Sequence, residues 1–195
     1  MASLGYTNFA SMTRADAKAY LEAFLGEMEP SLVRLATSLD CELTFSPDSL
    51  QPVWSALTTQ LAWRSGYTPP ELGQPGPRIV SDQLEPRGAL PSWFHHPSGA
   101  GYARFSAGTL WLIDGAARYL GETLIRKVGG RWSSGYAPSK GYMYQNQPVL
   151  NGLAPEELSP LQTCAVLSAR ALRQSPEPGP RTLADVYEQW SSQAR

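Results

Sequence analysis

Residues 109–130 read TLWLIDGAARYLGETLIRKVGG. Apolar side chains recur in this segment at helical spacing, at Ile113, Ala117, Leu120, Leu124 and Val128. Charged side chains recur four residues apart along another face, at Asp114, Arg118, Glu122 and Arg126. Ion pairs at this spacing each contribute about 0.2–0.5 kcal/mol to helix stability. Because two glycines end the pattern, we expect one amphipathic helix over 109–130 at the centre of the protein.

The composition is that of one folded domain. The chain has 195 residues, of which 42% are hydrophobic and 17% are charged, so we expect residues 1–195 to form a single domain. The net charge of −1 argues against nucleic-acid binding through bulk charge. The 13 arginines against 3 lysines, together with abundant Ala, Pro, Gly and Leu, are typical of a GC-rich bacterial genome.

Neither a metal site nor a membrane segment is expected. Cys41 and Cys164 form no metal-binding spacing and no disulfide framework, so we expect two buried reduced thiols and no cofactor. No stretch of about 18 apolar residues occurs that could cross a membrane. Residues 1–6 lack the basic segment and apolar run of a signal peptide. These features favour a cytoplasmic protein.

Helix-start signals mark the N-terminal third of the chain. Thr13 is expected to cap a first helix together with Asp16, and Pro30 separates this helix from a second, shorter one. Residues 41–45 alternate and favour β structure, which predicts a short strand. A third helix is expected over about 46–66, with a glycine as its C-terminal cap.

The C-terminal third predicts a hairpin and two helices. Residues 131–136 read as a strand and 142–147 as its antiparallel partner. Ser159, followed by a proline, starts another helix. The stiff Pro-rich linker at 175–181 leads to a last short helix, which we expect Thr182 to cap. The fold class that follows is α+β, with helices packed on a small antiparallel sheet.

Residues 67–105 form a long, irregular insert rich in proline and glycine. Seven prolines fall within it, and only residues 78–81 are a candidate strand. Connections longer than about 12–15 residues are uncommon in compact domains and are usually functional or mobile. We therefore expect this insert to contribute to a contact surface.

The motifs that resemble catalytic signatures lack the structural setting of those signatures. Tyr136 and Lys140 have the Tyr-x-x-x-Lys spacing of short-chain dehydrogenases, but no Gly-rich strand–turn–helix opens the chain. His95 and His96 are the only two histidines, and adjacent strand residues point to opposite faces, which disfavours a shared metal. Glu122 could act as a general base, although ion pairs along its helix explain it without catalysis. We therefore expect no catalytic residues, and enzymatic activity stays an open question.

Aromatic and amide side chains give the best indication of function. Four aromatic residues fall in the predicted hairpin beside three amides, and further aromatic residues lie in the insert. Tyrosine and tryptophan are enriched at protein interfaces, and they also suit pockets. The residues that we expect to bind are Trp93, His95, His96, Trp132, Tyr136, Tyr142, Tyr144 and Asn146. The alternative for Trp132 and Tyr144 is that these hairpin positions simply face the core.

A pair of segments resembles a group of small bacterial proteins. Tyr-Leu-Gly-Glu at 119–122 runs into Gly-Gly-x-Trp at 129–132 and a hairpin that contains a proline, and Ser-Pro-Asp-Ser-Leu at 46–50 precedes a helix with a tryptophan. This pattern resembles uncharacterised bacterial proteins, some of which are similar to immunity or accessory proteins of bacterial competition systems. The resemblance covers residues 41–66 and 110–150. It implies a fold and carries over no catalytic residue, and the Pro-rich insert departs from it.

Three functions are compatible with these patterns. Our leading hypothesis is a non-catalytic protein that binds another protein, such as a cognate toxin or a pathway protein, as immunity or accessory proteins do. The second is a small-molecule-binding protein or enzyme with a pocket between 67–105 and 131–148. It predicts an enclosed site that holds His95, His96 or Glu122. The third is a self-associating structural protein.

Overall fold

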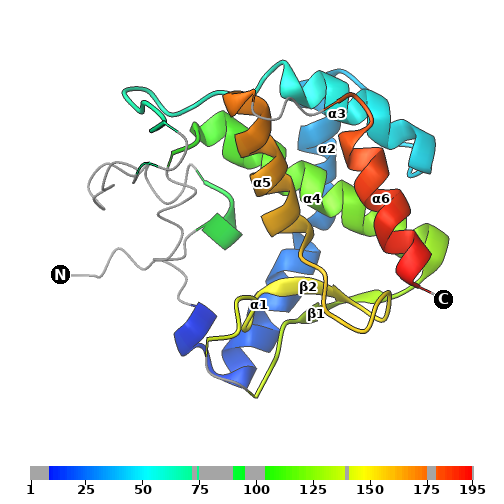
Figure 1. Ribbon diagram of the computed structural model, residues 1–195. Helices are drawn as coiled ribbons and strands as arrows, with labels where there is room; N and C mark the ends of the chain where they lie inside the picture. Colours follow the sequence, from blue (N-terminus) through cyan, green and yellow to red (C-terminus); the bar gives the residue numbers. More distant parts are fainter. Residues whose placement is uncertain are drawn as a thin grey trace.

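The protein is built around one long helix (Figure 1). The computed structural model describes residues 9–71, 74, 90–94, 104–138, 141–174 and 179–194. The described helices are α1 Arg14–Gly26, α2 Met28–Leu39, α3 Leu50–Thr58, α4 Ala107–Val128, α5 Pro160–Arg173 and α6 Thr182–Gln193. The described strands are β1 Arg131–Ser134 and β2 Pro148–Asn151, and single 3-10 turns occur at η1 Phe9–Ser11, η2 Pro47–Ser49 and η5 Ser92–Phe94. Helices packed with a small antiparallel sheet confirm the α+β class.

Helix α4 crosses the middle of the molecule and packs against α2, α3, α5 and α6 (Figure 1). It begins after Ser106, whose Oγ accepts a hydrogen bond from the Thr109 amide, and it ends at Gly129, whose φ of 106° favours glycine. The predicted central helix is therefore confirmed. Fourteen of its 22 residues are buried, more than one apolar stripe provides, because other helices cover it on several sides. No helix in the described part of the chain is both long and apolar enough to cross a membrane.

Strand β1 pairs with a segment that follows the predicted hairpin partner. Strand β1 pairs with β2, with Ser134 opposite Pro148, and the predicted partner at 142–147 belongs to the loop between them. This correction has a local cause. Asn146 has a φ of 62°, which interrupts an extended backbone, and its amide donates to the carbonyl of Gly135 at 2.7 Å across the base of the loop.

The segment 41–45 is not a strand, contrary to the prediction. It has no ladder partner in the described chain, and a side chain holds its end instead, because the amide of Phe45 donates to Tyr119 Oη at 3.1 Å. Phe45 itself has a φ of 54°, which is incompatible with an extended strand. An alternating pattern alone does not supply the neighbouring strand that a sheet needs.

Helix α3 ends at Thr58 rather than near Gly66. Beyond Thr58 the backbone is held by a long-range contact in place of helical hydrogen bonds. The hydroxyl of Thr109 accepts from the Ala62 amide at 2.8 Å and donates to the Ala62 carbonyl at 3.0 Å. The predicted C-terminal cap, Gly66, instead lies in a separate turn, where its φ is 76° and the Tyr67 amide donates to the Arg64 carbonyl at 3.0 Å.

The Pro-rich insert leaves and re-enters the fold at neighbouring points. Trp63 and Phe105 form an isolated antiparallel bridge, and the amide of Arg64 donates to the carbonyl of Arg104 at 2.8 Å. The base of the insert is thus closed by backbone hydrogen bonds. Outside the described residues lie the candidate strand at 78–81 and residues 175–178 of the predicted linker.

Two of the three predicted N-caps are confirmed. The Thr13 side chain caps α1 in a complete capping box, and the Ser159 side chain caps α5 ahead of a proline. The cap of α6 is Arg181 instead of Thr182, because the Thr182 hydroxyl donates to the Gly179 carbonyl at 2.7 Å and its residue already belongs to the helix.

Candidate functional site

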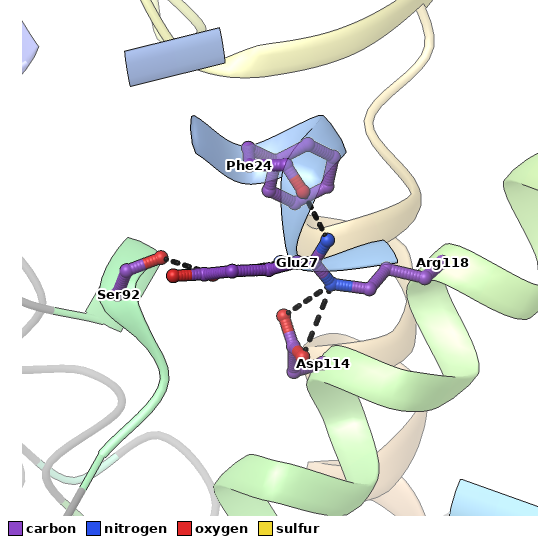
Figure 2. Close-up of polar contacts among 5 residues, drawn as sticks. All are labelled: Phe24, Glu27, Ser92, Asp114 and Arg118. Carbon is purple, nitrogen blue, oxygen red and sulfur yellow. Dashed lines mark hydrogen bonds and ion pairs between the residues drawn. The ribbon is translucent and has the colours of Figure 1, made fainter. Parts of the chain in front are cut away.

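A buried ion-pair network lies where the end of α1 meets α4 (Figure 2). Arg118 is 1% exposed, and its Nε donates to both carboxylate oxygens of Asp114 at 3.0 and 3.1 Å. Its Nη1 donates to the carbonyl of Phe24 at 2.5 Å, and its Nη2 to Glu27 Oε2 at 3.4 Å. The guanidinium carbon also lies 3.8 Å from the centroid of the Phe24 ring. The ion pair expected at positions 114 and 118 therefore forms, but inside the protein.

The turn η5 closes this network from the side of the insert (Figure 2). Ser92 Oγ donates at 3.0 Å to Glu27 Oε2, the oxygen that also meets Arg118. Trp93, one of the predicted binding residues, is 4% exposed and faces Asp114. Burial raises the pKa of the Asp114 carboxyl, and the charge of Arg118 opposes this effect. Trp93 therefore anchors the insert in the interior.

The contacts of this network join parts of the fold to one another. The guanidinium of Arg118 uses Nε, Nη1 and Nη2 on groups of the protein itself. Burial also raises the pKa of the neighbouring Tyr20 hydroxyl above its ordinary value of 10, at which a phenol is already neutral at physiological pH. Within the described ranges, no group of three or more His, Cys, Asp or Glu residues could hold a metal ion. The arrangement thus joins one end of the insert to the helices.

Trp132 and Glu122 form a corner between α4 and β1. Trp132 is 8% exposed, and its Nε1 donates to Glu122 Oε1 at 3.0 Å. The second oxygen of Glu122 lies 3.6 Å from Arg126 Nε. The indole contacts the ring of Phe24 edge-on at 5.2 Å and covers Gly121. Trp132 therefore faces the core, as the alternative interpretation expected. The carboxylate of Glu122 accepts the indole N–H and pairs with the guanidinium of Arg126.

Asn146 is also a structural residue. It is 7% exposed, and its Nδ2 donates to the carbonyls of Phe9 at 2.7 Å and Met12 at 3.1 Å. The base of the same loop is closed by the amide of Gly135, which donates to the carbonyl of Gln147 at 2.8 Å. The loop between the strands is thus tied both to itself and to the segment before α1.

Glu157 organises this loop from outside it, and sequence reasoning missed its role. Its Oε2 accepts from the hydroxyl of Tyr142 at 2.6 Å and from the amide of Tyr136 at 3.2 Å. Burial, together with the hydrogen bond to Glu157, raises the pKa of Tyr142. No sequence signal marks this carboxylate, because its partners are 15 and 21 residues away.

The remaining predicted aromatic residues lie at or near the surface of the loop. Tyr136 is 52% exposed and Met143 is 65% exposed, while Tyr142 and Tyr144 are half-buried and meet edge-to-face at 5.7 Å. The guanidinium carbon of Arg14 lies 4.7 Å from the centroid of the Tyr136 ring. We call the four side chains Tyr136, Tyr142, Met143 and Tyr144 the loop patch.

A second apolar surface, absent from the sequence-based predictions, is a groove along α2. Its volume is about 580 Å³, and its lining includes Leu25, Met28, Glu29, Leu32, Val33, Ala36, Leu43, Phe45 and Arg126. Leu25 is 41% exposed and Val33 is 59% exposed. Helical spacing alone does not show which apolar side chains of α1 and α2 a neighbouring element covers.

Two predicted binding residues, His95 and His96, lie outside the described residues. The pocket hypothesis therefore has one described member, Glu122, and its carboxylate is occupied by Trp132 and Arg126. No protein-family model, curated protein or solved structure matches the chain in comparisons with known proteins.

Proposed function

We propose that this is a non-catalytic, cytoplasmic protein of bacterial type that binds another protein, of the immunity or accessory kind, through the loop patch. One observation carries the proposal: Tyr136 and Met143 are exposed in the connection between β1 and β2, and its described residues are tied to the fold by the buried hydrogen bond from Asn146 and by the contact of the Tyr136 amide with Glu157. Exposed apolar side chains on a fixed scaffold are typical of recognition surfaces. Of the contact surface that the sequence predicts, the proposal thus keeps the loop patch in the connection between β1 and β2.

The fixed loop supports binding because it lowers the entropic cost of association. Ordering a flexible side chain at an interface costs about 0.5–1.5 kcal/mol, and ordering backbone costs more. Here Asn146 bonds to the segment before α1 and Glu157 bonds to Tyr142, so the described residues near both ends of the loop already have fixed contacts. A partner would therefore meet a preformed surface.

The residue types also support a protein partner. Tyrosine, methionine and arginine are enriched at interfaces relative to the rest of a protein surface. Tyr136 has one face near Arg14, so these two side chains present an aromatic ring and a cation together. Met143 adds a flexible apolar side chain that can adapt to a partner.

Affinity capture from a lysate of the producing cells tests the proposal. Wild-type protein is expected to retain a defined partner, and Y136S/M143S is expected to weaken retention about tenfold or more, because central aromatic contacts contribute about 2 kcal/mol or more. The matched control is V33S, which also replaces an exposed apolar side chain but lies on α2. Circular dichroism would check that each variant is folded.

Two results would contradict the proposal. One is a wild-type protein that retains nothing beyond an unrelated control protein. The other is a partner that Y136S/M143S retains as well as the wild type does, which would place the contact elsewhere on the molecule.

A further inference from the structure

The groove along α2 has a ridge on its own rim. Leu25, Glu29 and Val33 are spaced four residues apart, and all three are exposed. Glu27 lies in the turn between α1 and α2, where its amide bonds to the carbonyl of Ala23 and its carbonyl accepts from the Ser31 amide at 3.0 Å. All three side chains line the same groove across this junction. An apolar–acidic–apolar ridge thus borders the groove.

A cation belongs to the same groove. Arg126 comes from α4, and its guanidinium carbon lies 3.5 Å from the centroid of the Phe45 ring. Its side chain is 50% exposed, and its pairing with Glu122 is loose at 3.6 Å. The ring and the ion pair hold this guanidinium beside the apolar lining, where it keeps a solvent-facing side.

We propose that the occupant of the groove is a second copy of this chain, related by a two-fold axis. In this arrangement the ridge Leu25–Glu29–Val33 of each copy inserts into the groove of the other. Glu29 of one copy then meets Arg126 of the other, and the two-fold axis repeats this contact. Helices commonly pack by inserting a row of side chains spaced four apart into the groove of a neighbour.

Charge complementarity favours a second copy over an unrelated partner. A surface that carries both a ridge and a groove, and both an acidic and a basic residue, is complementary to itself after a two-fold rotation. The exposed fractions of Leu25 and Val33 give the contact an apolar centre with charges at its rim. Because the patch is confined to one helix row and its groove, we expect a weak dimer that forms at high protein concentration.

Sedimentation velocity of the full chain over a concentration series tests this proposal. The wild type is expected to shift from monomer to dimer as concentration rises. E29R and R126E each bring like charges together at both symmetric contacts, so each is expected to raise the dimer Kd about tenfold or more. The double variant E29R/R126E exchanges the two charges and is expected to restore dimerisation.

Two further variants keep the test independent of folding and of the proposed function. V33S removes part of the apolar ridge at an exposed position and is expected to weaken the dimer without lowering the melting temperature. Y136S/M143S alters only the loop patch and is expected to dimerise as the wild type does. A wild type that stays monomeric at every concentration overturns the proposal. So does a dimer that E29R leaves unchanged, or a groove that binds only a different protein.

Discussion

The indole ring of Trp132 lies directly on the backbone of Gly121: a β-carbon at position 121 would overlap Cζ2 and lie 2.8 Å from Cη2. We predict that G121A lowers the free energy of unfolding by about 2–3 kcal/mol, because a buried ring cannot move away from an added methyl group without disturbing the core. The displaced indole would also lose its hydrogen bond to Glu122. Urea denaturation followed by tryptophan fluorescence measures the change.

A matched control lies on the same helix. At Gly108 the nearest atom to an added β-carbon is 4.0 Å away, so G108A is expected to keep or raise stability, by up to about 1 kcal/mol. If G121A were as stable as G108A, the close contact with Trp132 would not be a constraint on the fold.

This contact gives a physical meaning to the Tyr-Leu-Gly-Glu and Gly-Gly-x-Trp segments. Tyr119 binds the Phe45 amide, Gly121 makes room for an indole, and Glu122 accepts its N–H. The spacing of these two segments therefore describes how α4 turns into β1. A motif of this kind predicts a fold and says little about activity.

Local signals were the most predictable part of the structure. The cap at Thr13, the Ser159 start and the glycine stop of α4 all depend on residues a few positions apart, and all three were predicted. The position of β2 was not, because strand register depends on contacts between distant segments. A φ of 62° at Asn146 has no signature that separates it from an ordinary strand residue.

The candidate surfaces were less predictable for the same reason. Asp114 and Arg118 show the spacing of an exposed ion pair, and only the packing of neighbouring helices decides that they are buried. Likewise, Trp93 and Trp132 are aromatic residues of the kind that interfaces use, but tertiary contacts place both in the core. Val33 is exposed because no described element packs over it, and a local sequence pattern does not reveal this.

The buried pair Asp114–Arg118 gives a second prediction. R118M leaves the Asp114 carboxylate buried without its main counter-charge, and we expect a loss of about 3–5 kcal/mol in the free energy of unfolding. D114L/R118M is expected to lose less free energy of unfolding than D114L and R118M lose together, since no unpaired charge remains between these positions. A double-mutant cycle from denaturation curves measures this coupling.

An exposed ion pair with the same four-residue spacing serves as the control for Asp114 and Arg118. Lys18 and Glu22 are 78% and 67% exposed and lie 3.8 Å apart. Removing either of them is expected to change the free energy of unfolding by no more than about 0.5 kcal/mol. Equal costs for the two pairs would contradict the assignment of a buried anchor.

The two cysteines are predicted to differ in reactivity. Burial raises the pKa of the Cys164 thiol to about 12, so at pH ~8 only about one molecule in 10⁴ carries the reactive thiolate. Cys41 is half-buried, and burial also raises its pKa, so it should react slowly but measurably. Iodoacetamide labelling read by peptide mass spectrometry is expected to find Cys41 alone in the native protein and both thiols in urea. Native labelling of Cys164 as fast as Cys41 would contradict its burial.

The capping box of α1 predicts a pH dependence of stability. Hydrogen bonds from the Thr13 side chain and backbone hold the pKa of Asp16 below its ordinary value of 3.8. A carboxyl whose pKa is lowered by folding contributes stability above its unfolded pKa and loses it as pH falls through the folded pKa. The melting temperature of D16A is therefore expected to fall below that of the wild type at neutral pH, and the difference should shrink as pH drops well below 3.8. E22A removes an exposed carboxylate elsewhere on the same helix and should show no such convergence. A D16A difference that is constant across this pH range would mean that the ionised carboxylate does not support the cap.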